Sequence, residues 1–284
     1  HLDDKIITAW NGLAISAFAR ACAVFGEQKY LDSAVRAAQF VREKLYDVKT
    51  RQLYRRWRDN ERKVFAIADD YAFLAQGLLD LYESSFDPQW LEWAIELTDA
   101  GLDRFFDDDN GGFFMTEKTA GTELLFRVKE DSDNVEPCAS SVFTRNLLRL
   151  GQFTGSEKYS SAADRTLRHY APQMKTAPRA LPEMISALSY ALGEKSEIVV
   201  VGDSNADDTR QMLREIQSRF IADKVIVLLD TPSTVERMSK IQPFFKNFAG
   251  SKDRAAVYIC KNFTCGLPVT DIQTLRAQFS IPPP

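Results

Sequence analysis

The strongest constraint on the fold of this sequence is an internal repeat of a helical pattern. Residues 28–47 align without a gap on residues 88–107, so that Tyr30 falls on Trp90 and Ala34 on Ala94. A weaker third copy begins near Ser140. Repeated units of this kind bury their apolar faces against neighbouring units, so the self-similarity predicts a repeat architecture.

Each copy has the pattern of two amphipathic helices joined by a short polar turn, as at residues 26–29 in the first copy. Small residues on the first helices predict close helix packing, namely Ala14, Ala17, Ala21 and Gly77. Aromatic segments at 53–57 and 111–116 follow the first two pairs and are predicted to be extended or β-hairpin arms. A seventh helix is predicted over 182–192.

The pattern changes its period after Glu194. Short β-branched runs at 197–201, 224–229 and 255–260 are typical of buried strands, and helical segments alternate with them. The expected organisation over residues 1–194 is therefore mainly α, with three hairpins and a seventh helix. A small α/β subdomain with a partly parallel sheet is expected over residues 195–284.

Composition excludes several classes of function. The chain has 284 residues and a net charge of -4, which gives no electrostatic reason to expect nucleic acid or an anionic membrane as partner. No apolar run is long enough to span a bilayer.

The chain has four cysteines without a C-x-x-C pair, and two histidines. This content predicts reduced thiols, a cytoplasmic location and neither a metal site nor a cofactor. Nucleotide binding after the strand at 197–201 is a weak alternative, because the segment that follows this strand contains a single glycine and not the G-x-G-x-x-G pattern of dinucleotide-binding loops.

Polar and aromatic residues gather where the first helix of each copy begins. If these helices form the inner ring of a toroid, their N-termini open on one rim, which then carries the carboxylates, amides and flat aromatic rings that bind sugars. Paired carboxylates are the acid and base of glycoside chemistry. The predicted catalytic residues are Asp70 and Glu136, with Glu183 in reserve, and the predicted substrate-binding residues are Trp10, Asn11, Tyr71, Asp69 and Ser141.

A structural interpretation of the same residues stays open. Asp69, Ser140 and Ser141 have the residue types that cap helices. Trp10 is equally compatible with a core aromatic wedged between hairpins, and Asp70 and Glu136 with purely structural carboxylates. His169, on a second helix, is interpreted as a packing residue.

Several motifs, spread in order along the chain, together resemble the spermatogenesis-associated protein 20 family, whose bacterial members include YyaL. They are LDDKIITAWNGLAISAFARA, ADDYAFLAQGLLDLYE, NGGFFMT, RVKEDSDNVEP, LLRLGQFTG, ALPEMISAL and VYICKNFTCGLPVTD. The resemblance implies a thioredoxin-like domain followed by an (α/α)6 toroid similar to those of N-acylglucosamine 2-epimerases and six-hairpin glycosidases. This chain would be the C-terminal portion, with about half of the toroid.

The acidic loop departs from the family pattern D-G-A-E-P-S-x-N-S. Here residues 133–141 read DNVEPCASS, which keeps Glu136, Pro137 and Ser141 but lacks the glycine and the asparagine. If that asparagine binds a ligand in the family, an altered or weakened activity is expected in this chain.

Two functions follow as expectations. The first is a carbohydrate-active toroid that hydrolyses or isomerises sugars with rim carboxylates; histidine-based epimerisation is disfavoured because His169 is the only histidine beyond the first residue. The alternative is a non-catalytic sugar- or peptide-binding scaffold that partners a thioredoxin-like redox domain. The first residue is not Met, so an N-terminal remainder is expected, and apolar flanks of an incomplete ring would pack against it or dimerise.

Overall fold

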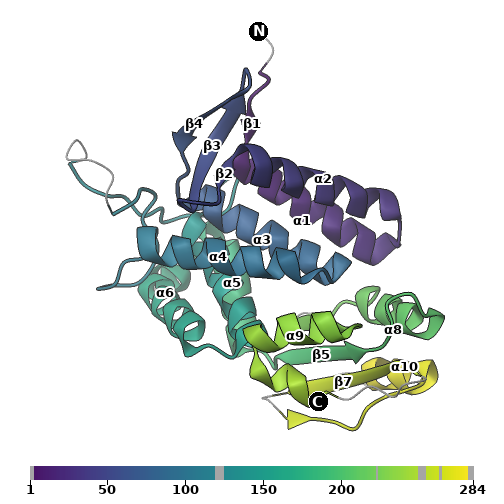
Figure 1. Cartoon of the computed structure of the whole chain (residues 1–284). Helices are drawn as coiled ribbons and strands as arrows, with labels where there is room; N and C mark the ends of the chain where they lie inside the picture. Colours follow the sequence, from purple (N-terminus) through teal and green to yellow (C-terminus); the bar gives the residue numbers. More distant parts are fainter. Residues whose placement is uncertain (1–2, 119–124, 222, 249–253, 262–263, 281–284) are drawn as a thin grey trace.

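The computed structural model describes residues 3–118, 125–221, 223–248, 254–261 and 264–280. Helical hairpins form one part of the molecule and a small sheet with its own helices packs beneath them (Figure 1). The three predicted hairpins and the seventh helix are all present. Their bounds are α1 Thr8–Phe25, α2 Gln28–Lys44, α3 Ala68–Ser85, α4 Pro88–Phe105, α5 Ala139–Thr154, α6 Glu157–Thr176 and α7 Pro182–Leu192, the last preceded by the 3-10 turn Pro178–Ala180.

Helices α1 and α3 approach each other through glycines. A Cβ added to Gly12 would lie 2.4 Å from the backbone carbonyl carbon of Phe73, and one added to Gly77 would lie 2.5 Å from the carbonyl oxygen of Gly12. The sequence assigned part of this role to Ala14, Ala17 and Ala21, but Ala17 is exposed. A methyl group is already too large at the crossing point, so only glycine permits this distance.

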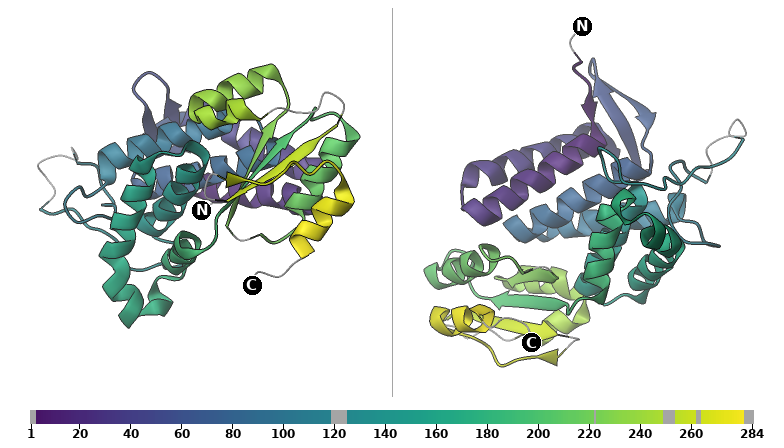
Figure 2. Two further views of the ribbon diagram at one scale, coloured as in Figure 1. Left: turned by 90° about the horizontal axis from the view of Figure 1, so that it is seen from below. Right: turned by 180° about the vertical axis from the view of Figure 1, so that it is seen from behind.

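The two ends of the hairpins differ in the length of their connections. Links from first to second helices are two residues long, at 26–27, 86–87 and 155–156, whereas residues 45–67 and 106–138 connect second helices to the next first helix. The long connections gather at one rim, as Figure 2 shows from two further sides. The inner-helix N-termini are therefore surrounded by loops, which are the usual carriers of functional residues.

The first long connection forms a β-hairpin, as predicted for its aromatic segment. Its strands are β2 Tyr46–Asp47, β3 Gln52–Arg58 and β4 Glu61–Phe65, and β3 also pairs with β1 Ile6–Ile7. The second aromatic segment was predicted to be extended or a hairpin arm, and within the described residues its pairing is limited to an isolated bridge between Phe106 and Phe113.

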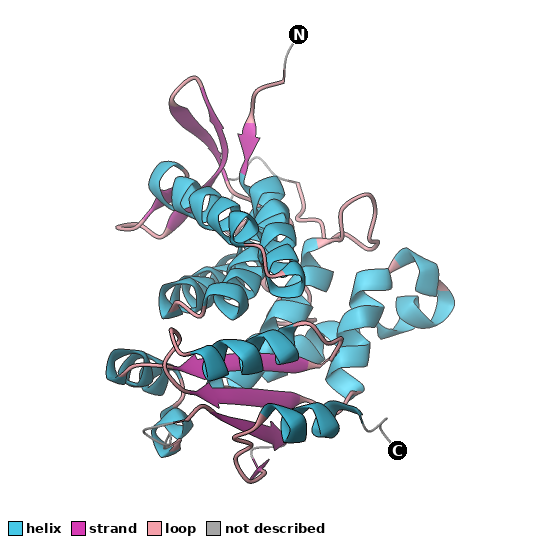
Figure 3. Ribbon diagram, turned by 90° about the vertical axis from the view of Figure 1, so that its right-hand side faces the viewer, coloured by secondary structure: helices cyan, strands magenta, loops and turns pink. Residues whose placement is uncertain are grey.

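The C-terminal subdomain is a four-stranded sheet in the order β6-β5-β7-β8, partly parallel as predicted, because β5 runs parallel to β6 and antiparallel to β7. Helices cover the sheet from both sides (Figure 3). One face, with Val199 and Val201, joins the helical core, and the other, with Ile198 and Val200, packs on α8 and α10. The bounds are β5 Ser196–Val201, α8 Asp207–Gln217, β6 Lys224–Leu229, α9 Pro232–Ile241, β7 Ala256–Lys261, β8 Thr264–Cys265 and α10 Ile272–Ser280, with a 3-10 turn at Pro243–Asn247.

The prediction that all cysteines are reduced is wrong for one pair. Cys260 and Cys265 form a disulfide, because the β7–β8 pairing places them directly opposite each other. Cys22 and Cys138 are free thiols. No helix within the described residues has both the length and the apolar character needed to cross a membrane.

Candidate active site at an acidic rim

Trp10 and Glu136 meet at the rim although they are far apart in the sequence. The indole Nε1 of Trp10, at the start of α1, donates a hydrogen bond of 2.6 Å to Oε1 of Glu136, which lies in the connection before α5. Trp10 remains 52% exposed, so its ring is presented to solvent. A ring held by its edge with its face free can act as a stacking platform, which fits the predicted role better than a core wedge.

Asp69, at the first turn of α3, is the residue with the chemistry of a general acid. Its Oδ1 is buried and has no hydrogen-bond partner in the part of the chain that the structure describes. Burial, followed by repulsion from Glu130, Asp70 and Glu136, raises the pKa of Asp69 to about 7. Burial and repulsion from Glu136 also raise the pKa of Glu130. Asp69, Glu130 and Glu136, which we call the acidic cluster, therefore lie close enough for the charges of Glu130 and Glu136 to act on the Asp69 carboxyl group.

The prediction that Asp70 is catalytic does not fit its surroundings. Asp70 is completely buried, and its two oxygens accept hydrogen bonds of 3.0 Å each from the backbone N–H groups of Ala9 and Ile67 and from Arg55. Burial raises its pKa despite these donors. With both oxygens occupied by N–H groups and no access to solvent, this carboxylate has no position for proton exchange with a ligand. Asp70 instead joins α1, β3 and the start of α3.

Two predicted substrate-binding residues are also corrected. Tyr71 is completely buried, packs against Phe105 with ring centroids 5.4 Å apart, and accepts a hydrogen bond from the Leu53 N–H. Ser141 is completely buried, with its hydroxyl 3.2 Å from the Cys138 sulfur. Both side chains point into the core and not toward the rim. Neighbouring positions on a helix face different directions, so a residue near a helix N-terminus at the rim need not face the rim. Asn11 is half-buried and donates to the Ile7 carbonyl at 2.9 Å.

Glu183 is not brought into the acidic cluster. The charges that act on its carboxyl are those of Arg145, Asp133, Arg20 and Asp80, and burial raises its pKa. Asp133, in the acidic loop before α5, determines the position of this segment. Its carboxylate accepts hydrogen bonds from the backbone of Cys138 at 2.9 Å and of Glu183 at 2.8 Å, and so fixes the starts of α5 and α7.

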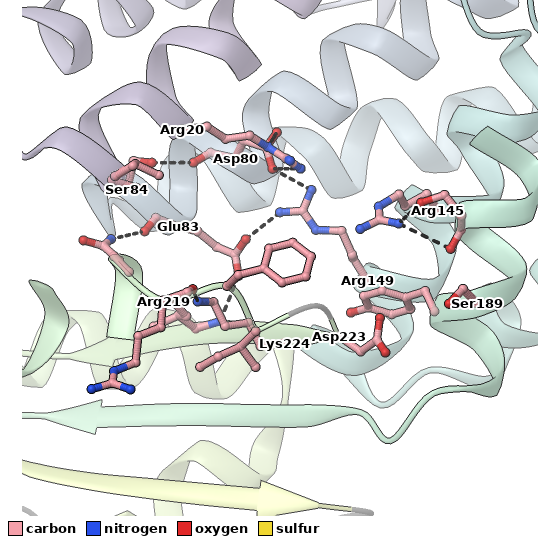
Figure 4. Close-up of a pocket in the computed structure, with 18 of the residues that line it drawn as sticks. Arg20, Asp80, Glu83, Ser84, Arg145, Arg149, Ser189, Arg219, Asp223 and Lys224 are labelled. Atoms are coloured by element: carbon pink, nitrogen blue, oxygen red, sulfur yellow. Dashed lines mark hydrogen bonds and ion pairs between the residues drawn. The ribbon is translucent and has the colours of Figure 1, made fainter. Parts of the chain in front are cut away.

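A cavity of about 670 Å³ lies away from the acidic cluster, between the inner helices and the α/β subdomain, at residues that the sequence did not indicate. Figure 4 shows its charged lining, with Arg149 pointing between Asp80 and Glu83. Glu83 also accepts a hydrogen bond of 2.8 Å from the backbone N–H of Ile226 in β6. Because these charges neutralise one another and hold α3, α5 and β6 together, we assign them a structural role. The acidic cluster, with its unpartnered carboxyl oxygen, remains the better candidate for chemistry.

The comparisons with known proteins first define the class of fold. The chain is similar over 93% of its length to cellobiose 2-epimerase from Bacillus thermoamylovorans B4167, with a TM-score of 0.50 and 13% identity, covering 67% of that chain. The helical part is thus a portion of an (α/α)6 toroid, as expected.

No protein-family profile matches the sequence. Individual relatives do: spermatogenesis-associated protein 20 of Rattus norvegicus is 39% identical and that of Homo sapiens 37% identical, each over 97% of this chain. The chain therefore belongs to the spermatogenesis-associated protein 20 family, and it spans 36% of the length of these relatives.

Replacing Asp69 by asparagine is expected to stabilise the protein at pH 8 but not at pH 4. The pKa of Asp69 is about 7 in the folded chain and near 3.8 when unfolded, so the folded state loses stability as pH rises between these values. Asparagine removes this loss, which we expect to be on the order of 2 kcal/mol after allowance for partial exposure. Urea denaturation at both pH values measures it.

The matched control for this measurement is Asp109→Asn, in the exposed turn after α4, for which no such gain is expected. A variant Asp69→Asn that is less stable than the wild type at pH 8 would show that the carboxylate makes a stabilising contact, contrary to the interpretation given above.

Proposed function

We propose that the acidic cluster is the acid–base centre of a carbohydrate-active site, and that its chemistry is glycoside hydrolysis. The observation that carries the proposal is the unpartnered, half-buried Asp69 with a pKa of about 7 beside Glu136, which holds the exposed ring of Trp10. A solved protein with the same fold is by name an epimerase of the disaccharide cellobiose, which adds support for a sugar as the ligand class.

The roles follow from the surroundings of each carboxyl group. Asp69, half protonated near neutral pH, donates its proton to the glycosidic oxygen as the bond to the leaving sugar breaks. Glu136, oriented by the Trp10 N–H, acts as the second carboxylate, either on a water molecule or directly on the anomeric carbon. A separation of about 6.5–9.5 Å between the carboxyl groups would direct inversion and about 5–5.5 Å retention.

Hydrolysis is favoured over isomerisation because His169 is not placed as a base of this site. It lies on the second helix α6, with its ring against Tyr170 at a centroid distance of 4.9 Å. Burial, followed by the charge of Lys129, lowers its pKa. The acidic cluster offers carboxyl groups only, and paired carboxyl groups match glycoside cleavage.

The test is turnover of an oligosaccharide panel by the wild-type chain and by Asp69→Asn, followed as released reducing ends. We expect the variant to lose at least about 100-fold in turnover while retaining binding, since general acid catalysis supplies that much. The loss should be far smaller on dinitrophenyl glycosides, whose leaving group needs no proton. Trp10→Ala should instead weaken binding, and Asp109→Asn should match the wild type.

The outcomes separate the alternatives. Sugar binding without turnover would favour the non-catalytic scaffold over the hydrolase. Equal losses on oligosaccharides and dinitrophenyl glycosides would remove Asp69 from the role of proton donor. Absence of binding to every sugar in the panel would overturn the proposal.

We also propose that the exposed side of α1 packs against the remainder of a longer protein that includes a thioredoxin-like domain. Phe18 and Phe25 are 40% and 61% exposed and lie seven residues apart, which places them on the same side of this helix. Exposed apolar stripes of this kind are typical of packing surfaces. In the proposed arrangement, further helices of the ring cover α1 and close the acidic rim from the opposite side.

A further inference from the structure

We propose that Cys260 and Cys265 form an exchange site for external thiols, with Glu197 as the proton donor to the departing sulfur. The site lies in the α/β subdomain, away from the acidic rim, and does not depend on the proposed sugar chemistry. Its substrate class is a small thiol or dithiol reductant.

Strand pairing places the three side chains in one row across the sheet. Glu197 in β5 is the direct partner of Cys260 in β7, and Cys260 is the direct partner of Cys265 in β8. Residues directly opposite each other on antiparallel strands have their side chains on the same face of the sheet. The carboxyl of Glu197 is therefore next to the disulfide, on the face that is turned toward the helical part.

Glu197 has the features of a functional group and lacks those of a structural one. It is only 6% exposed, and its Oε1 has no hydrogen-bond partner in the described part of the chain. Burial alone raises the pKa of Glu197 to about 7. A buried carboxyl group that no donor satisfies destabilises the fold, so its presence beside a disulfide calls for a chemical explanation.

A cavity of about 340 Å³ gives Glu197 and Cys260 a common space. It lies between the sheet and the α5–α6 hairpin, and Glu157 at the start of α6 and Lys195 before β5 are its other titratable lining groups. The Tyr82 hydroxyl on α3 also lies within electrostatic range of Glu197. Cys260 is buried and Cys265 is partly exposed on the edge strand β8, so the two sulfurs differ in access.

The difference in solvent access between the two sulfurs determines which one is attacked and which one leaves. An external thiolate attacks the Cys265 sulfur, a mixed disulfide forms there, and the bond to Cys260 breaks with the electron pair on the Cys260 sulfur. Protonated Glu197 gives its proton to that thiolate, so a thiol and a carboxylate remain. A second thiol of the reductant, as thiolate, then displaces Cys265, which leaves the reductant oxidised and both cysteines reduced.

The experiment is the rate of reduction by dithiothreitol from pH 6 to pH 8.5, with alkylation and mass spectrometry to count the thiols at each position. In the wild-type chain, the rate divided by the thiolate fraction of the reductant should fall as pH rises through about 7. Glu197→Gln should be slower by about 100-fold at pH 6, the low end of general acid catalysis, and the two rates should converge above pH 8.

Glu157→Gln is the matched control, because it removes another carboxyl group from the same cavity. It should follow the wild-type profile, and Cys22 serves as an internal thiol reference. Three results would overturn the proposal: free thiols at 260 and 265 in protein purified without reductant, reduction that requires denaturant, or a wild-type profile with no fall near pH 7. The wild-type pH profile is measured without any variant, so the proposal can be tested even if Glu197→Gln does not fold.

Discussion

Replacing Arg149 by leucine is expected to lower the free energy of unfolding by about 3–5 kcal/mol. The guanidinium is buried, with Nη1 2.8 Å from Asp80 and Nη2 2.6 Å from Glu83. Leucine fills part of the volume but leaves two carboxylates short of a counter-charge, with Arg20 and Ser16 as the remaining side-chain partners of Asp80. Urea denaturation followed by circular dichroism measures the loss.

An exposed pair provides the control for this large effect. Arg168 binds Asp164 one helical turn away on α6, at 2.7 Å, and both side chains are largely in solvent. Arg168→Leu should change stability by no more than about 0.5 kcal/mol. If both leucine variants lose only about 0.5 kcal/mol of unfolding free energy, the buried network does not hold α3, α5 and β6 together as we describe.

Gly12→Ala is the second substitution with a large expected effect. The added methyl group would lie 2.4–2.6 Å from three backbone atoms of Phe73 and Leu74, so α1 and α3 must move apart. Overpacking costs about 1–3 kcal/mol and more where backbone must shift. The gain of about 1 kcal/mol from the helix propensity of alanine offsets only part of this. Because the clashing atoms belong to the backbone, we expect the upper end of this cost and a net loss of about 2 kcal/mol in urea denaturation.

Gly151→Ala separates crowding from propensity. Gly151 lies inside α5, and the nearest atom to an added Cβ is 3.8 Å away. Alanine there should stabilise the chain by up to about 1 kcal/mol. A destabilising Gly151→Ala, or a neutral Gly12→Ala, would contradict the close α1–α3 packing.

The repeated helical pattern and the change of period after Glu194 were sufficient to predict helical hairpins followed by a small α/β subdomain, and the family resemblance added the toroid. Both signals come from local periodicity, which the structure preserves in the hairpins and in the strands. The disulfide was not predictable in the same way, since it depends on the pairing register of β7 and β8. The role of Gly12 likewise depends on where two helices cross, and no local pattern encodes that position.

The candidate site was predictable as a region but not residue by residue. The sequence indicated the rim, Trp10 and Glu136, and the structure brings the latter two together. It assigned catalysis to Asp70 and substrate binding to Asp69, whereas the surroundings of the two carboxyl groups lead us to propose Asp69 as the acid. Adjacent helical residues differ in direction by about 100°, so one carboxyl group reaches the acidic cluster while its neighbour is buried against α1 and β3.

The unequal connections at the two ends of the hairpins bear on how such a ring can diversify. Two-residue turns leave little freedom to change length, because they fix the spacing of the helices that they join. The long connections at 45–67 and 106–138 can accept insertions and deletions at a small entropic cost. A change in these loops can therefore alter the acidic rim without altering the helical frame, and loop grafting between homologues is the natural route to re-engineer this rim.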